Sequence, residues 1–189
     1  MRWIAPIKAY LAVGIGLLWF HSAWGALLAF HLAIVVLLLF AKPNIPIHIL
    51  FRSNNIKWIV VSILICGSSG ITLYFLWTYF GFANDLPRQV ESLGLNAITW
   101  PAFITYFALV NPFIEEYFWR GYLGNLTKGF NIYDFVYAGF HALILINKMW
   151  TGAIIYGLVV LTLAGWFWRQ ISREDHSSAL SSREARKSI

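Results

Sequence analysis

The chain is poor in charged residues and in cysteine. Charged residues make up 12% of its 189 residues, which is about half the share found in soluble domains. Hydrophobic residues make up 59%, which is more apolar surface than a soluble domain of this length can bury. Because Cys66 is the single cysteine, the sequence can form neither an internal disulfide nor a Cys-x-x-Cys metal site. These shortages exclude soluble and disordered proteins and favour a multi-pass membrane protein.

The net charge of +6 does not form a basic patch. The 14 Lys and Arg residues are spread between long uncharged runs, whereas a nucleic-acid-binding surface gathers its basic residues on one face. We therefore expect membrane lipid, and not nucleic acid, as a partner.

Six apolar segments are long enough to be membrane-spanning helices, which need about 20 residues with a range near 17–25. They are residues 3–20, 23–41, 58–80, 97–119, 132–147 and 149–168, of which the fifth is short. Aromatic residues crowd the ends of these segments, as is typical of side chains at a membrane interface. Gly14, Gly16, Gly67 and Gly70 are expected to let helices approach closely. The sequence predicts an all-α fold, a polytopic membrane helix bundle with about six transmembrane helices.

The basic residues predict how this bundle is oriented. With the N-terminus inside, twelve of the fourteen lie on the inner side, and only Arg88 and Lys148 lie outside, which agrees with the positive-inside rule. Both termini are then cytoplasmic, and the plasma membrane is the expected location. The chain divides into an N-terminal three-span region (1–96), a core region (97–170) and a polar cytoplasmic tail (171–189).

An unusual charged cluster lies at the end of the fourth predicted span, with Glu115 and Glu116 inside the span and Arg120 directly after it. Ionisable residues inside a membrane are costly, so they mark function by default. Glu116 and Arg120 are one helical turn apart and can pair, whereas Glu115 points about 100° away from Glu116. Asn111 lies one turn before Glu115. The cluster predicts one carboxylate that is held by an arginine and one that is available for catalysis; the alternative is an anchor at the inner interface.

His141 in the fifth predicted span is the second unusual group. Tyr137 lies one turn before it and Asp134 two turns before it. A histidine that meets a carboxylate of another helix can activate water, and Glu115 is one connection away. His31 in the second span can reach the same cavity, but no motif surrounds it, so we expect His31 to serve in packing.

These residues resemble the signatures of the CAAX-protease and bacteriocin-processing family, which are glutamic-type intramembrane endopeptidases and include the CAAX prenyl-protein endopeptidases. The first signature, EExxxR, is met by EEYFWRG at 115–121, with Trp119 where the family usually has Phe. The second, an aromatic residue, then any three residues and then His, is met by Tyr137 and His141. The resemblance covers roughly residues 98–170.

The resemblance implies a mechanism. Glu115 would polarise a water as general base, His141 would help to hold and activate that water, and the pair of Glu116 and Arg120 would fix the helix. The implied reaction is hydrolysis of a peptide bond inside or beside the bilayer.

One family signature is absent. On a following helix the family has His, three residues and then Asn, which are implied to stabilise the oxyanion; here His176 lies in the polar tail without an Asn, so the core region is expected to lack the last helix of the family. Losing an oxyanion donor costs on the order of 10²–10³ in rate. Either the protein is a degenerate member, or a partner subunit or second copy supplies the groups, or Asn111, Tyr156 or Thr162 substitutes. Asn111 and Tyr137 are the candidates for contact with substrate or oxyanion.

We expect neither a bound metal nor a cofactor, because Glu115 and His141 are only two possible ligands and a catalytic zinc normally has three. The leading hypothesis is an intramembrane endopeptidase that acts on a peptide or protein substrate. The alternative is a catalytically degenerate member that acts as a membrane scaffold or partner subunit, in a homo-oligomer or with another protein. A small transporter is a third class, which the lack of a symmetric pair of broken spans disfavours.

Overall fold

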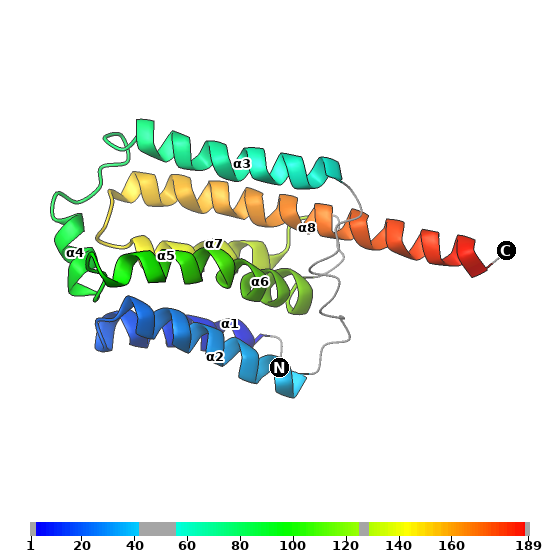
Figure 1. The fold of residues 1–189 in the computed structure, drawn as a ribbon, viewed down its shortest axis with the longest axis horizontal. Coiled ribbons are helices and arrows are strands. Elements are labelled where there is room, and N and C mark those ends of the chain that lie inside the picture. The colour runs from blue at the N-terminus through cyan, green and yellow to red at the C-terminus, as the bar shows by residue number, and fades with distance from the viewer. Residues whose placement is uncertain (1–2, 42–55, 125–128, 188–189) are drawn as a thin grey trace.

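The structure is a computed structural model that describes residues 3–41, 56–124 and 129–187, without the side chains of 172–187 and of a few residues between 58 and 69. All regular structure in these residues is helical, which confirms the all-α class there, and the helices form one layered bundle (Figure 1). In chain order they are α1 (Ala5–Gly14), the π-helix η1 (Ile15–Trp19), α2 (Ala23–Ala41), α3 (Ile56–Phe75), α4 (Leu86–Ser92), α5 (Thr99–Leu109), α6 (Asn111–Glu115), the π-helix η3 (Glu116–Tyr122), α7 (Ile132–Leu145) and α8 (Thr151–Lys187).

Two of the described helical segments are long and apolar enough to cross a membrane, namely Ala23–Ala41 and Thr151–Ile171. Three further apolar segments are shorter: Ala5–Trp19, Ile63–Phe75 and Ile132–Leu145. The predicted bundle of about six spans therefore stays a prediction. Residues 42–55, which make up most of the stretch between the second and third predicted spans, lie outside the described residues.

The fourth predicted span, residues 97–119, is not one helix. It is divided at Val110, so that α5 ends at Leu109 and α6 begins at Asn111. Pro112 explains the division, because it has no N–H to bond the carbonyl of Ala108 and its ring crowds that carbonyl. After Glu115 the helix widens into η3, where the Leu123 N–H donates to the Phe118 carbonyl at 2.9 Å. Such π-helical turns are frequent at functional sites.

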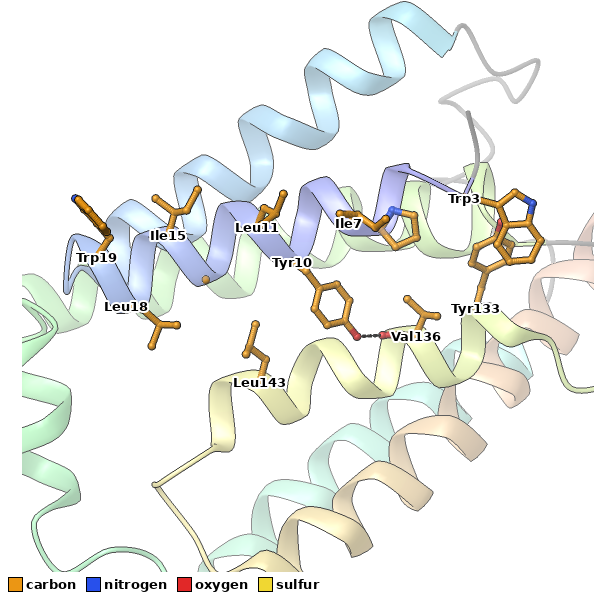
Figure 2. Close-up of a pocket in the computed structure, with 12 residues that line it drawn as sticks. Trp3, Ile7, Tyr10, Leu11, Ile15, Leu18, Trp19, Tyr133, Val136 and Leu143 are labelled. Atoms are coloured by element: carbon orange, nitrogen blue, oxygen red, sulfur yellow. Dashed lines mark hydrogen bonds between the residues drawn. The ribbon is translucent and has the colours of Figure 1, made fainter.

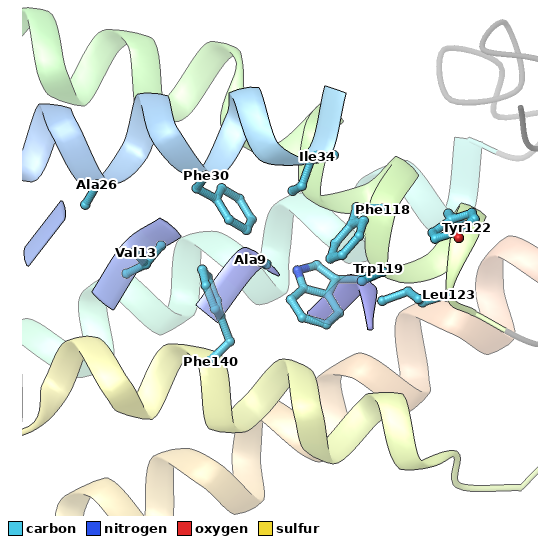
Figure 3. Packing of buried hydrophobic residues seen from close by; sticks show 11 residues of the cluster. Ala9, Val13, Ala26, Phe30, Ile34, Phe118, Trp119, Tyr122, Leu123 and Phe140 are labelled. Carbon is cyan, nitrogen blue, oxygen red and sulfur yellow. The ribbon is translucent and has the colours of Figure 1, made fainter. Parts of the chain in front are cut away.

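The core lies where α1, α2, η3 and α7 meet (Figure 3). The Phe30 and Phe140 rings stack with their centroids 4.8 Å apart, and Trp119 lies 5.8 Å from Phe140. The buried apolar cluster consists of Ala5, Ala9, Val13, Ala26, Phe30, Ile34, Phe118, Trp119, Tyr122, Leu123 and Phe140. Because these residues come from both sides of the predicted boundary at residue 96, the two regions share one core.

The close approach of η1 to α2 depends on Gly16. A Cβ at this position would overlap the backbone of Ala26, so the predicted role of glycine is confirmed here. It is wrong for Gly14 and Gly70, where an added Cβ would meet nothing within 4 Å. Gly67 lies among the positions whose surroundings are not described.

At the end of the bundle that carries α4, the turns bond to one another (Figure 1). The Ala83 N–H donates to the Lys148 carbonyl at 2.9 Å, and the Trp150 N–H donates to the Gly81 carbonyl at 3.1 Å. The Ala23 N–H donates to the Leu93 carbonyl at 2.9 Å. These bonds join the start of α2, the segment around α4 and the turn between α7 and α8.

A buried ion pair ties α8 to the start of α7. Arg169 donates from Nη2 and Nε to the two carboxylate oxygens of Asp134, at 2.7 and 3.2 Å. Asp134 also accepts from the Asn131 N–H at 2.8 Å, while the Asn131 side chain accepts from the Tyr133 N–H at 3.1 Å. These bonds satisfy N–H groups at the beginning of α7, which have no partner within the helix.

Helix α8 continues to Lys187, through most of the segment that we expect to be a polar tail. Residues 171–187 contain neither glycine nor proline, so nothing in the local sequence stops the helix. Figure 1 shows this part of α8 extending past the other helices.

An apolar groove with a volume of about 770 Å³ lies between the α1–η1 segment and α7 (Figure 2). Trp3 and Trp19 lie toward its two ends, and the Tyr10 hydroxyl donates to the Val136 carbonyl at 2.6 Å. Neither Glu115 nor His141 lines this groove, so the groove is separate from the predicted catalytic pair.

Candidate active site

Glu115 and His141 face each other between the end of α6 and the second half of α7. The distance from His141 Nε2 to Glu115 Oε1 is 3.9 Å, and the two side chains are 25% and 13% exposed. This separation exceeds a direct hydrogen bond of about 2.7–3.2 Å, yet one water can lie at hydrogen-bond distance from both atoms. The structure thus brings together the two residues on which the sequence-based mechanism depends.

The partner of the other ring nitrogen determines which atom of His141 carries the proton. Its Nδ1 lies 3.0 Å from the Tyr137 carbonyl oxygen, and a carbonyl can only accept a hydrogen bond. Nδ1 is therefore the donor. In a neutral imidazole this leaves the lone pair on Nε2, which is the nitrogen nearest Glu115.

Glu116 pairs with Arg120 one turn later, as the spacing predicts. The Arg120 guanidinium carbon lies 5.5 Å from the centroid of the Tyr137 ring, which is within the range of a cation–π contact. The Tyr137 ring in turn meets the His141 ring edge-on, with centroids 4.5 Å apart. Tyr137 therefore connects the acid–arginine signature to the histidine signature.

His31, for which the sequence predicts a role in packing, lies beside this group. Its ring is buried, with Nε2 3.0 Å from Asn111 Oδ1 and Nδ1 2.9 Å from the Tyr106 hydroxyl. Asn111 is also buried and precedes Glu115 by one turn of α6, and Glu115 lies within electrostatic range of the His31 ring. The sequence did contain one sign that His31 has a functional role, because it is an ionisable residue in the middle of an apolar span. No motif indicated its partners.

Asp134 is not part of the group around His141. Its carboxylate is occupied by Arg169 and by the Asn131 N–H. The pair of Asp134 and Arg169 could not be predicted from the sequence, because the two residues are 35 positions apart and no local pattern links them.

Of the three residues considered as substitutes for the missing signature, Asn111 shares the short helix α6 with Glu115 and lies one turn before it. The Tyr156 side chain is 60% exposed. The Thr162 hydroxyl donates to the Leu158 carbonyl of its own helix at 2.8 Å, so that donor is already used. The side chain of His176 lies outside the described residues.

The described residues contain no group of three or more His, Cys, Asp or Glu side chains that could hold a metal ion. The expectation of a site without metal stays a prediction that rests on the two-residue donor set.

The part of the chain that contains these residues is similar to a known protein family. Residues 97–177 match the family described as type II CAAX prenyl endopeptidase, Rce1-like. This matched segment covers less than half of the chain and contains Asn111, Glu115, Glu116, Arg120, Tyr137 and His141 but not His31. The chain matches no curated protein and no solved structure. For the matched segment, the resemblance to CAAX proteases is confirmed.

Proposed function

We propose that this protein is an intramembrane endopeptidase of glutamic type, with Glu115 as general base and His141 as the second group that holds the attacking water. The observation that carries the proposal is the separation of 3.9 Å between Glu115 Oε1 and His141 Nε2. The pairing of Glu116 with Arg120 supports it, since only one of the two adjacent acids is then directed toward the histidine.

The chemistry needs one water between these two groups. A water about 2.8 Å from Glu115 Oε1 and from His141 Nε2 would donate one hydrogen bond to each, because both atoms accept. Its oxygen lone pairs then point away from both side chains and toward a substrate carbonyl carbon. As the oxygen attacks, the water proton passes to Glu115, which later delivers it to the amide nitrogen as the C–N bond breaks. The products are a carboxylic acid and an amine.

The surrounding residues support this arrangement. Glu116 holds Arg120, Arg120 lies over Tyr137, and both the ring and the carbonyl of Tyr137 contact His141. We assign Glu116, Arg120 and Tyr137 to positioning. Asn111 is the candidate donor to the oxygen of the scissile carbonyl, where a side-chain amide can stabilise developing negative charge.

The proposal extends to the setting of the reaction. We propose a plasma-membrane protein with about six spans and with both termini cytoplasmic, in which the three-span region 1–96 packs against the protease-like region 97–170. The family name points to a peptide whose C-terminal CAAX cysteine carries a prenyl group, so such a peptide is the first substrate to test.

A membrane scaffold or partner subunit without catalytic activity is the second candidate. It is favoured by the sequence after His141, which contains no His-x-x-x-Asn pattern.

The test uses the full chain in liposomes. The probes are a quenched fluorescent peptide with a farnesylated CAAX end, the same peptide without farnesyl, and a labelled transmembrane peptide. We expect the wild type to cleave at least one of them, and Glu115→Gln and His141→Ala to lose at least 10²-fold, roughly the cost of removing a catalytic acid–base group. Glu91→Gln, which changes an exposed acid of α4, is the control and should keep full activity.

Thermal unfolding of each variant shows whether it is folded. If folded Glu115→Gln and His141→Ala variants both retain full activity, the mechanism is wrong. A wild type that cleaves none of the probes, but purifies with a partner whose binding is insensitive to Glu115→Gln, would favour the scaffold instead.

A further inference from the structure

We propose that His31 is a positioning residue of the active site, which orients the side-chain amide of Asn111 so that its NH₂ group faces the substrate. The inference rests on the proposed function and adds to it a residue from α2, outside the matched segment 97–177.

The hydrogen bonds around His31 run in one direction. Asn111 Oδ1 can only accept, so the His31 Nε2 that lies 3.0 Å from it must carry a proton. In the neutral ring Nδ1 then has the lone pair and accepts from the Tyr106 hydroxyl at 2.9 Å. The order is Tyr106 O–H to His31, and His31 N–H to Asn111.

This direction determines how Asn111 presents its amide. The oxygen and nitrogen of an asparagine amide differ little in shape, and its last torsion angle is only weakly restricted. A donor at His31 Nε2 holds the oxygen, so the NH₂ group with its two protons lies on the opposite side. Without that donor the amide can rotate and present its oxygen, which would repel the negative charge that develops on the scissile carbonyl.

Burial strengthens this preference. His31 and Asn111 are 5% and 4% exposed, and a hydrogen bond shielded from water is electrostatically stronger than one in solvent. Asn111 lies on α6 one turn before Glu115, so an amide held there is close to the general base. The N-terminal region thus supplies a support for the oxyanion donor in a chain that lacks the His-x-x-x-Asn signature.

The test is a double-mutant cycle in the liposome assay with the farnesylated CAAX peptide. We expect His31→Leu to lower kcat by at least about tenfold. The loss should not exceed that for removing an oxyanion donor outright, which is on the order of 10²–10³-fold. KM should change by less than about threefold, because the developing charge exists only in the transition state. In an Asn111→Ala background, His31→Leu should have no further effect.

Two variants separate positioning from packing. His31→Gln keeps an N–H donor near the place of Nε2 and should retain kcat within about threefold of the wild type. Leu32→Ala changes the exposed neighbour of His31 on α2 and should leave the activity unchanged. Additive losses from His31→Leu and Asn111→Ala, or a His31→Gln variant as poor as His31→Leu, would overturn the inference.

A spectroscopic measurement does not depend on turnover. In protein labelled with ¹⁵N-histidine, the resonances of His31, assigned through His31→Gln, should report a proton on Nε2 and should shift in Asn111→Ala. A proton on Nδ1 alone would overturn the inference. Activity that survives Glu115→Gln overturns the proposed function itself, which is a different result from additivity in the cycle.

Discussion

Two adjacent acids in this protein have different surroundings. Glu115 faces His141 across 3.9 Å, whereas Glu116 is paired with Arg120. Neighbouring helical residues point about 100° apart, so two adjacent acids can lie on different faces of one helix. This divergence lets one carboxylate support the structure while the other is directed toward the histidine.

Glu116→Ala should destabilise the protein more than Glu115→Ala does. It removes the carboxylate partner of Arg120, whose side chain is 12% exposed, and removing one partner of a buried ion pair costs about 3–5 kcal/mol. Glu116 itself is 34% exposed, so solvent lowers the expected cost to about 1–3 kcal/mol. The free energy of unfolding in one micelle system measures both variants, and equal values for the two would contradict the assignment.

Chelators should not affect cleavage. Glu115 and His141 offer two ligands, and a catalytic zinc is normally held by three protein groups. We expect activity in EDTA or in 1,10-phenanthroline to equal that in the untreated sample. A loss of activity that added Zn²⁺ restores, while the inactive control Glu115→Gln stays inactive, would show that a metal takes part.

The helices of this chain are interrupted where the site is built. Pro112 divides α5 from α6, and the helix then widens into η3 immediately after Glu115. The division leaves Asn111 and Glu115 on one short helix, and the wider η3 carries Glu116 and Arg120. The irregular backbone therefore coincides with the residues that we assign to catalysis and positioning.

The packing of η1 on α2 should be sensitive to residue size at Gly16 and not at Gly14. A valine at Gly16 must displace the backbone of Ala26, and overpacking of this kind costs about 1–3 kcal/mol. Gly14→Val is the matched control, because a Cβ there meets nothing within 4 Å. Thermal unfolding of the two variants measures the difference, and equal losses of stability would show that the contact with Ala26 is not the cause.

The bundle is one unit joined at several points along its length. The core takes residues from α1, α2, η3 and α7, the turns near α4 bond to one another, and Arg169 fixes α8 to the start of α7. His31 continues this pattern, because it connects the N-terminal region to the end of α5 and to α6.

Cysteine labelling should place the turns near α4 and the C-terminal tail on opposite sides of the membrane. In a Cys66→Ser background, which removes the single native cysteine, Arg88→Cys should react with an impermeant maleimide from outside and Lys187→Cys only after permeabilisation. This follows from the positive-inside distribution of basic residues. Labelling of both positions from the same side would contradict the predicted arrangement of spans.

Much of the local structure could be predicted from the sequence. The apolar segments predicted where helices occur, because burial of backbone N–H and C=O groups in an apolar setting favours internally bonded helices. The pair of Glu116 and Arg120 followed from a spacing of four, since residues one turn apart are neighbours on any helix. The juxtaposition of Glu115 and His141 came from the resemblance of two short motifs to a known family.

The contacts of His31 with Tyr106 and Asn111, and of Asp134 with Arg169, could not be predicted in this way. They join residues that are 35 to 80 positions apart, and no periodicity specifies which faces of distant helices will meet. Side-chain packing selects those faces. Examples are the close approach of Gly16 to Ala26 of α2 and the stacking of Phe30 on Phe140. The amino-acid order thus determined the helical, membrane-like character of the chain and its charged motif, whereas the fit of side chains between helices determined which histidine meets which acid or amide.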